Sequence, residues 1–244
     1  MTFRIGIDLG GTKTELVVLN PMGEACYRVR VATPAQDYHR IITAITALVK
    51  EAEKRLAITA SVGIGTPGSL SPGTPLMRNA NTRCLNGKPF CQDLSLALER
   101  EVRMANDANC FALSEAVDGA GQGHQVVFGV ILGTGTGGGV VVNRQCLNGV
   151  NGVAGEWGHN PLPWPTPAES PGPECFCGKR GCIETFVSGT GLARDFAATG
   201  AAPLRPQQIA ERAAAGDTRA IVTLERYHDR LARALASVVN LLDP

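Results

Sequence analysis

The sequence of 244 residues predicts an α/β protein built from two related domains. A strand, a turn of glycine and threonine and a second strand occupy residues 3–19. The same succession returns at residues 126–143, with the same residue types in the turn. Because a repeated supersecondary unit indicates related domains, we expect one domain over residues 1–118 and a second over residues 119–244, facing each other across a cleft.

The first domain is predicted to alternate strands with helices. Its strands are expected at residues 3–9, 14–19, 26–31, 61–65 and 102–105. Apolar residues at helical spacing predict a helix over residues 37–57, with Asp37 as its N-cap. Further helices are expected over residues 93–100 and 107–120. Glycine, proline and asparagine dominate residues 69–89, so a loop is expected there.

The second domain is predicted to begin as a hairpin and to end in helices. Strands at residues 126–132 and 140–143 flank the turn at residues 133–139. Prolines crowd residues 160–173 and exclude a helix or a central strand there. The residues from Asp217 to Leu242 predict a long amphipathic helix. Its expected apolar face consists of Ile221, Leu224, Leu231, Leu235, Val238 and Leu242.

Composition excludes several classes of partner. The formal net charge is +1 and no basic block occurs, which gives no electrostatic basis for binding nucleic acid. The longest apolar runs are far shorter than the roughly 20 residues that a membrane-spanning helix requires. A strand, rather than a secretory signal, starts at Phe3. We therefore expect a cytoplasmic protein that binds neither nucleic acid nor membrane.

The two glycine and threonine turns are the first chemical signal. Glycine lets backbone N–H groups approach an anion and threonine adds hydroxyl donors, so such turns can hold phosphate groups. Two turns in a repeated context favour this interpretation over plain glycine hairpins. The candidate residues are Asp8, Gly10, Gly11, Thr12 and Lys13 in the first turn, and Gly133, Thr134, Gly135, Thr136 and Gly137 in the second. Asp8 could hold Mg²⁺ through water.

Asp107 follows a predicted strand and begins a predicted helix. The simpler interpretation makes it a helix N-cap, a position where aspartate is common. The alternative makes it a general base that takes a proton from a hydroxyl attacking phosphorus. The local sequence alone favours capping.

His159, Cys175, Cys177 and Cys182 form a candidate metal site. One imidazole and three thiolates are a typical tetrahedral set for Zn²⁺, and four protein ligands leave no open position, so the zinc should be structural. A cytosolic location argues against disulfides, since thiols are kept reduced there. The alternative is a group of unpaired thiols.

At this point the chain resembles the ROK family (repressors, open reading frames and sugar kinases) over essentially its whole length. The motifs that carry the resemblance are Asp8–Lys13, Gly63–Gly68, Asn106–Asn109, Leu132–Gly139, Gly155–His159 and Cys175–Glu184. Three segments, at 79–81, 85–87 and 156–164, most resemble bacterial fructokinases. The resemblance implies the actin-like ATPase (ribonuclease H-like) fold, with ATP and sugar in the cleft and a zinc-binding insert over residues 155–184.

The resemblance also implies an ATP-dependent kinase that transfers the γ-phosphoryl group to the 6-hydroxyl of a hexose. Fructose is the expected sugar, and N-acetylglucosamine or N-acetylmannosamine is the alternative. Asp107 is implied as the catalytic base, against the capping interpretation. The residues implied to bind the sugar are Gly68, Asn81, Asn106, Asp107, Glu156, His159 and Glu184. His159 would hold zinc through one ring nitrogen and sugar through the other.

The remaining expectations also follow from the resemblance. The two turns would bind the phosphates of ATP with Mg²⁺, and Lys13 would either add a charge or be a solvated strand residue. A homodimer is expected. Repressors of the family carry a helix-turn-helix domain ahead of the first turn, where this sequence has only the residues before Asp8, so a repressor is not expected. Family members continue past the position of Pro244, so we expect the chain to be a fragment that lacks part of the adenosine pocket.

Overall fold

The computed structural model describes residues 2–71 and 73–244, and within them the chain forms two compact units. Unit 1 comprises the chain up to Cys110 together with Asn148–Val153, and unit 2 comprises Phe111–Leu147 and Ala154–Pro244. The expected domain limits at 118 and 119 stay a prediction. Met1, in the expected first domain, and Pro72, in the expected loop, lie outside the described residues.

Unit 1 contains a mixed sheet with the strand order β3-β2-β1-β4-β7. The strands are β1 (Phe3–Leu9), β2 (Lys13–Leu19), β3 (Ala25–Ala32), β4 (Ala60–Thr66) and β7 (Val102–Asn106). The first three run antiparallel, whereas β1, β4 and β7 run parallel, as the pairs Asp8↔Gly65 and Thr66↔Asn106 show. The carboxyl ends of the three parallel strands therefore meet at one edge of the sheet.

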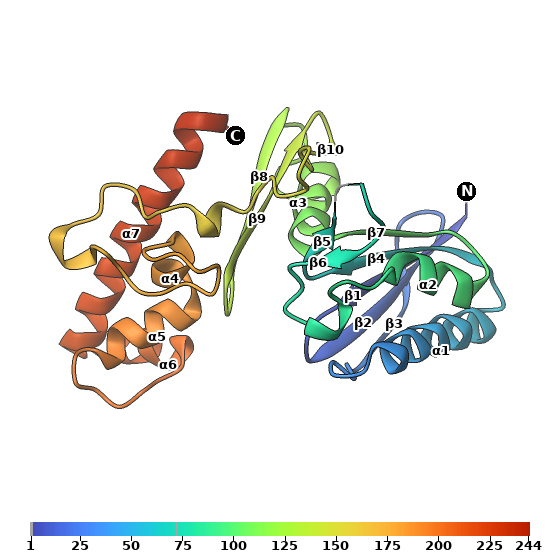
Figure 1. The fold of residues 1–244 in the computed structure, drawn as a ribbon, viewed down its shortest axis with the longest axis horizontal. Helices are drawn as coiled ribbons and strands as arrows, with labels where there is room; N and C mark the ends of the chain where they lie inside the picture. The colour runs from blue at the N-terminus through green and yellow to red at the C-terminus, as the bar shows by residue number, and fades with distance from the viewer. Residues whose placement is uncertain (1, 72) are drawn as a thin grey trace. The chain divides into compact units, whose positions relative to one another are not determined.

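Helix α1 (Tyr38–Leu56) covers one face of this sheet (Figure 1). Asp37 caps it by accepting a hydrogen bond from the backbone N–H of Arg40 at 3.1 Å, which confirms the predicted cap. The side chains at Ile41, Ile45 and Val49 are buried because their spacing places them on one side of the helix. They pack with the buried strand residues into one apolar core.

One further helix completes unit 1, and a second begins in unit 1 and continues along the chain into unit 2. They are α2 (Phe90–Leu98) and α3 (Asp107–Asp118). Helix α2 begins three residues before the predicted start, because Phe90 and Leu94 are both fully buried and belong to the same apolar face.

The predicted loop over residues 69–89 is wrong in part. It contains two short paired strands, β5 (Ser69–Leu70) and β6 (Met77–Arg78), and a 3₁₀ turn at Arg83–Leu85. Met77 is buried and its backbone exchanges hydrogen bonds with Lys88 and Gly87, at 2.9 and 2.8 Å. Backbone bonds between distant residues order this segment, and periodicity cannot reveal them.

Unit 2 contains an antiparallel sheet with the strand order β10-β9-β8. The strands are β8 (Val126–Leu132), β9 (Thr136–Val142) and β10 (Gln145–Cys146). The predicted turn over residues 133–139 is too long, because Gly137 and Gly139 pair with Ile131 and Gly129 inside the ladder. In both units a glycine turn joins two antiparallel strands, as the sequence predicts.

Short 3₁₀ turns and helices follow the hairpin of unit 2. The turns are η2 (Trp157–His159) and η3 (Pro167–Glu169), and the helices are α4 (Ile183–Val187), α5 (Gly189–Ala197), α6 (Pro206–Ala214) and α7 (Thr218–Leu242). The proline-rich stretch thus holds a 3₁₀ turn, which Pro167 can begin because it lacks an N–H that would need a partner. Helices α4 to α6 pack along α7 (Figure 1).

The predicted apolar face of α7 is rotated from the observed one. Ile221 is 37% exposed, whereas Ala220, Thr223, Arg230 and Ala234 are buried. Small side chains at Ala220 and Ala234 let the neighbouring segments approach the helix closely, and two arginines, Arg230 and Arg233, bind carboxylates on other elements. Leu231, Leu235 and Val238 are partly buried beside this stripe.

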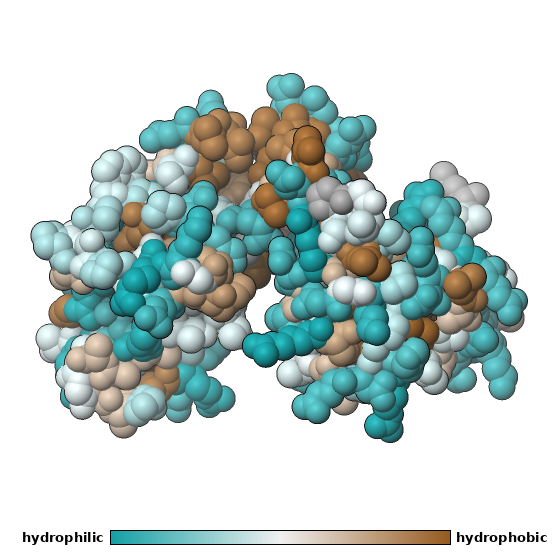
Figure 2. Space-filling view, viewed as in Figure 1, coloured by the Kyte–Doolittle hydropathy of each residue, from teal (hydrophilic) through white to brown (hydrophobic). Residues whose placement is uncertain are grey.

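The last turns of α7 leave apolar side chains exposed to solvent. Val239 is 51% exposed and Leu241 is 82% exposed. The space-filling view shows apolar residues gathered over this end of the helix (Figure 2). The amphipathic pattern of α7 thus continues past the part of the helix that its neighbours cover. Among the described residues, no helix combines the length and the apolar character that crossing a membrane requires.

Substitution of Gly129 by alanine should destabilise unit 2. A Cβ atom at Gly129 would lie 2.7 Å from the Cβ of Ala112 and 2.9 Å from its Cα, so β8 and α3 would have to separate. We expect Gly129→Ala to lower the free energy of unfolding by about 1–3 kcal/mol in urea denaturation. Gly63→Ala on β4 is the control, since its nearest atoms lie 3.9 Å away. Equal stability of the two variants would contradict the contact.

Candidate functional site

Asp8 and Asp107 come from the edge of the unit 1 sheet where the parallel strands end. Asp8 lies near the end of β1, and Asp107 directly follows β7 as the first residue of α3. The side chain that caps α3 is Asn106, whose Oδ1 accepts from the N–H groups of Ala108 at 2.9 Å and Asn109 at 3.3 Å. Asp107 also accepts from Ala108 at 2.8 Å. The helix therefore has a cap without Asp107.

Both carboxyl groups remain accessible to solvent, yet both have raised pKa values. Desolvation by the surrounding protein raises the pKa of Asp107, and the negative charge of Asp8 raises it further, against hydrogen bonds from the Ala108 backbone and Asn106 that lower it. Desolvation also raises the pKa of Asp8, with the charge of Glu15 adding to the effect and Arg30 opposing it. Two accessible carboxylates that repel each other favour the uptake of a proton or a cation.

The first glycine turn closes tightly beside this acidic pair. Gly10 donates its N–H to the carbonyl of Lys13 at 2.9 Å, and a Cβ on Gly10 would lie 2.9 Å from that oxygen. Thr33 braces the turn, since its hydroxyl donates to Gly10 O at 2.8 Å and its N–H to Thr12 O at 3.0 Å. Gly11, Thr12 and Lys13 are exposed. No local signal in the sequence indicates the bracing role of Thr33, which directly follows β3.

Three more predicted residues gather at the same edge. The amide of Asn106 donates to Gly68 O at 3.1 Å. Gly68 has a φ of +79°, and a Cβ there would lie 2.4 Å from Arg78 O, so only glycine fits. A Cβ built on Gly11 would lie 3.8 Å from the Oδ1 of Asn81, which places that amide beside the glycine turn. Unit 1 thus brings its predicted site residues together.

In unit 2, the second glycine turn is bonded to the start of helices α4 and α5. Thr136 donates its N–H to Glu184 Oε2 at 2.8 Å, and a Cβ on Gly135 would lie 2.5 Å from the same oxygen. Gly189 donates to Gly133 O, and the hydroxyl of Thr190 donates to Thr134 O, both at 2.8 Å. Glu184, predicted for sugar, therefore also fixes this turn.

The segment Gly155–His159 lies against the backbone of β9. A Cβ on Gly155 would lie 2.5 Å from Gly138 O, and one on Gly158 would lie 2.3 Å from Thr136 O. Trp157, which the sequence did not single out, is buried and donates its indole N–H to Gly137 O at 2.8 Å. These contacts fix the positions of Glu156 and His159, on either side of Trp157 and Gly158.

The four predicted metal ligands converge. The ligand atoms of His159, Cys175, Cys177 and Cys182 all lie within 4.8 Å of one another. A tetrahedral zinc with bonds of about 2.3 Å needs sulfur atoms about 3.8 Å apart, and the Sγ atoms of Cys177 and Cys182 are 3.7 Å apart. Nδ1 of His159 lies 3.5 Å from the sulfur of Cys175, so Nε2 is the ring nitrogen left for another partner. The donor set fits zinc.

The chain is similar to known proteins over nearly its whole length. The model of the ROK family matches residues 4–244. An N-acetyl-D-glucosamine kinase of Yersinia pseudotuberculosis is 40% identical over 243 residues, which cover 98% of this chain and 80% of the relative.

Two solved structures are similar to the chain. The ROK hexokinase of Thermus thermophilus superposes with a TM-score of 0.86 at 32% identity, covering 99% of this chain and 79% of that one. The ROK family glucokinase of Streptomyces griseus, solved with glucose and AMPPNP, gives a TM-score of 0.75 at 30% identity, covering 99% and 80%. The chain thus spans about four fifths of the length of its relatives. It belongs to the ROK family and has the actin-like ATPase fold of the ROK sugar kinases.

Proposed function

We propose that the protein is an ATP-dependent kinase that phosphorylates the 6-hydroxyl of a hexose. The observation that carries the proposal is the acidic pair of Asp8 and Asp107 beside a closed glycine turn, at the edge where β1 and β7 end. A partly desolvated carboxylate that α3 does not need as its cap is free to act as a base. The N-acetyl-D-glucosamine kinase and the hexokinase described above support the same activity.

Asp107 is proposed as the general base. Its carboxylate accepts the proton of the 6-hydroxyl while that oxygen forms a bond to the γ-phosphorus of ATP. The bond between the γ-phosphorus and the bridging oxygen breaks, and ADP leaves with the electron pair. The raised pKa of Asp107 brings its basicity closer to that of a useful proton acceptor at neutral pH.

The glycine turns are proposed to bind the phosphates of ATP. Gly10–Lys13 and Gly133–Gly137 both contain backbone N–H groups and threonine hydroxyls, which are donors for phosphate oxygens. Mg²⁺ bound with ATP would neutralise the charge that develops on the transferred phosphoryl group. Asp8 is the carboxylate proposed to orient that ion through water. The side chain of Lys13 is exposed and makes no hydrogen bond to the part of the chain that the structure describes.

The residues proposed to bind the sugar are those that the resemblance to the family implies, namely Gly68, Asn81, Asn106, Asp107, Glu156, His159 and Glu184. A zinc ion held by Nδ1 of His159 and the three cysteines would fix the tautomer of that ring. Nε2 of His159 would then face a sugar hydroxyl in a defined orientation.

N-acetyl-D-glucosamine is the substrate that we propose first. Relatives that are 39–40% identical over almost the whole chain are kinases of this sugar, which favours it over the fructose expected from the sequence. Fructose remains the second candidate, because the segment Glu156–Trp164 resembles that of bacterial fructokinases. Both sugars carry a primary hydroxyl that the same base can deprotonate.

Replacement of Asp107 by asparagine should abolish most of the turnover. Asparagine keeps the shape and the acceptor for Ala108 but cannot take a proton, so kcat should fall by about 10²-fold or more while sugar affinity changes by less than about tenfold. Coupled detection of ADP measures this. Asp37→Asn, which preserves the cap of α1, is the control and should be fully active. Near-normal turnover of Asp107→Asn would refute the assignment.

The same variant should be more stable than the wild type at neutral pH. Folding raises the pKa of Asp107, so the ionised carboxylate destabilises the folded state above that pKa, and the penalty disappears below the unfolded value of about 3.8. Asp107→Asn should therefore unfold at a higher urea concentration at pH 7, and the difference should vanish as the pH falls below 4. A variant that is less stable at pH 7 would contradict the desolvation argument.

Steady-state kinetics with a panel of sugars tests the substrate. We expect kcat/KM for N-acetyl-D-glucosamine to exceed that for fructose by at least tenfold, a difference of about 1.4 kcal/mol in transition-state binding. N-acetylmannosamine and glucose serve as comparison sugars in the same assay. A ratio that favours fructose would make the protein a fructokinase, and absence of ADP release with every sugar, measured on the full-length protein, would refute the kinase proposal.

A further inference from the structure

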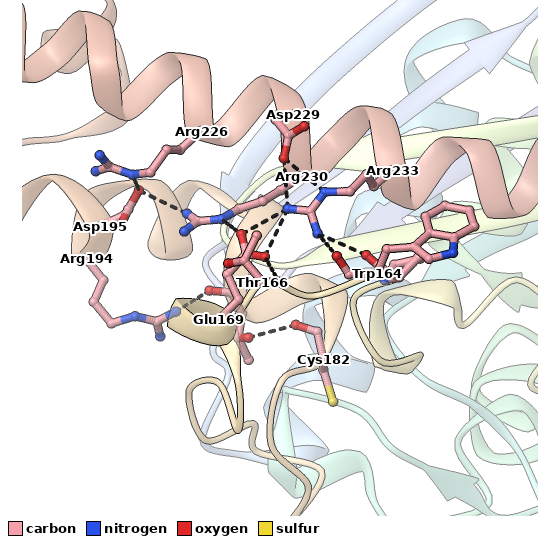
Figure 3. A network of polar contacts seen from close by, with 12 residues as sticks. Trp164, Thr166, Glu169, Cys182, Arg194, Asp195, Arg226, Asp229, Arg230 and Arg233 are labelled. Carbon is pink, nitrogen blue, oxygen red and sulfur yellow. Dashed lines mark hydrogen bonds and ion pairs between the residues drawn. The ribbon is translucent and has the colours of Figure 1, made fainter.

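A cluster of buried charges joins three elements of unit 2 (Figure 3). Glu169 of η3 accepts from Arg230 Nε at 2.8 Å and from Arg233 Nη2 at 2.9 and 3.1 Å. Arg230 also donates to Asp195 of α5 at 3.0 Å. We call Glu169, Asp195, Arg230 and Arg233 the Glu169 cluster. Its glutamate is 7% exposed and Arg230 is 9% exposed, so the pair is held away from water.

The Glu169 cluster holds a particular segment, residues 160–174. This segment connects the first candidate metal ligand, His159, to the second, Cys175. Besides binding Glu169, Arg233 donates to the carbonyls of Pro163 at 3.0 Å and Trp164 at 2.8 Å. Glu169 in turn accepts from the N–H of Thr166 at 2.9 Å. Helix α7 thus binds both the start and the middle of the segment.

The segment has little regular structure of its own. Its described elements are the 3₁₀ turn at Pro167–Glu169 and isolated bridges at Pro161 and Glu174. Closing such a segment between two ligands costs conformational entropy unless its path is already fixed. Contacts that fix the path in the absence of metal lower the cost of metal binding.

The charges in the cluster interact strongly. Burial raises the pKa of Glu169, but the hydrogen bonds from Arg233 and Arg230 outweigh burial and lower the pKa to about 2. The carboxylate is therefore ionised at neutral pH and is matched by two guanidinium groups. The guanidinium of Arg230 also lies 5.2 Å from the centre of the Phe186 ring on α4, the helix that begins directly after the ligand Cys182.

We propose that Glu169 is a positioning residue that docks residues 160–174 on α7 and so presets the site of His159, Cys175, Cys177 and Cys182 for its metal. The proposal rests on the metal assignment made above. Removing the Glu169 carboxylate leaves the four metal ligands unchanged. Bringing them together around the metal then costs more conformational entropy. The metal affinity should fall by about 10- to 100-fold, the effect typical of removing a group that orients metal ligands.

The test measures metal binding directly. Metal-free protein is titrated with Co²⁺ in the presence of a competing chelator, and thiolate-to-cobalt absorption reports both occupancy and ligand set. We expect the wild type to bind one equivalent. Glu169→Gln should bind at least tenfold more weakly, with the same spectrum at saturation because the ligands are the same. Saturating Zn²⁺ should restore the KM for sugar of Glu169→Gln.

Asp195→Asn is the matched control. Asp195 belongs to the same cluster and binds Arg230 and Arg226, but it lies on α5 and makes no hydrogen bond to residues 160–174, all of which the structure describes. Its metal affinity should stay within about threefold of the wild type. Asp229→Asn, which removes the negative charge from the exposed partner of Arg233, should behave likewise.

Each result supports or overturns the proposal. Unchanged affinity in Glu169→Gln overturns it, and so does an equal loss in Asp195→Asn, which would indicate general destabilisation. If Glu169→Gln does not fold, Arg233→Lys carries the test, because lysine keeps the charge but cannot bind Glu169 and both carbonyls at once. A wild type that binds no metal refutes the metal assignment itself, whereas normal wild-type binding with unaffected variants refutes only the role of Glu169.

Discussion

The close contact between the segment Gly155–His159 and the backbone of β9 is the constraint on which the site of unit 2 depends. Only glycine allows the approaches at residues 155 and 158, where a Cβ would lie 2.5 and 2.3 Å from carbonyl oxygens. With this contact, the indole of Trp157 reaches Gly137 O, and His159 comes within reach of the cysteines. The contact therefore helps to fix the positions of Glu156 and His159. The positions of Glu156 and His159 thus depend on the absence of a side chain at Gly155 and Gly158.

Unit 1 arranges its polar groups by a different principle. Parallel strands end at a common edge, so Asp8 on β1 and Asn106 on β7 both lie there, with the end of β4 between them. Asn106 and Asp107 have different roles at the start of α3. Asn106 satisfies the N–H groups at the helix terminus, and Asp107 keeps a partly desolvated carboxylate beside another one. Such an arrangement is costly for folding, and this cost is a common property of residues that act on substrates.

The sequence correctly predicted the features that depend on interactions between neighbouring residues or on the chemistry of metal ligands. The strands before and after each glycine turn, the cap at Asp37 and the convergence of His159 with three cysteines all follow from neighbouring residues or from ligand chemistry. The predictions were wrong where contacts between residues far apart in the sequence determine the structure. The strand at Met77 is ordered by Lys88, and the buried side of α7 includes Arg230, which binds carboxylates on η3 and α5. Hydrophobic spacing contains no information about such partners.

The two tryptophans of the chain differ in their exposure to solvent, so their fluorescence can be distinguished with a quencher. Trp157 is 4% exposed, packs edge-on against Phe128 and donates a hydrogen bond, whereas Trp164 is 63% exposed. A collisional quencher dissolved in water reaches an exposed indole far more readily than a buried one. After quenching, the residual tryptophan fluorescence therefore comes mainly from Trp157, and it reports on the packing of Gly155–His159 without any label.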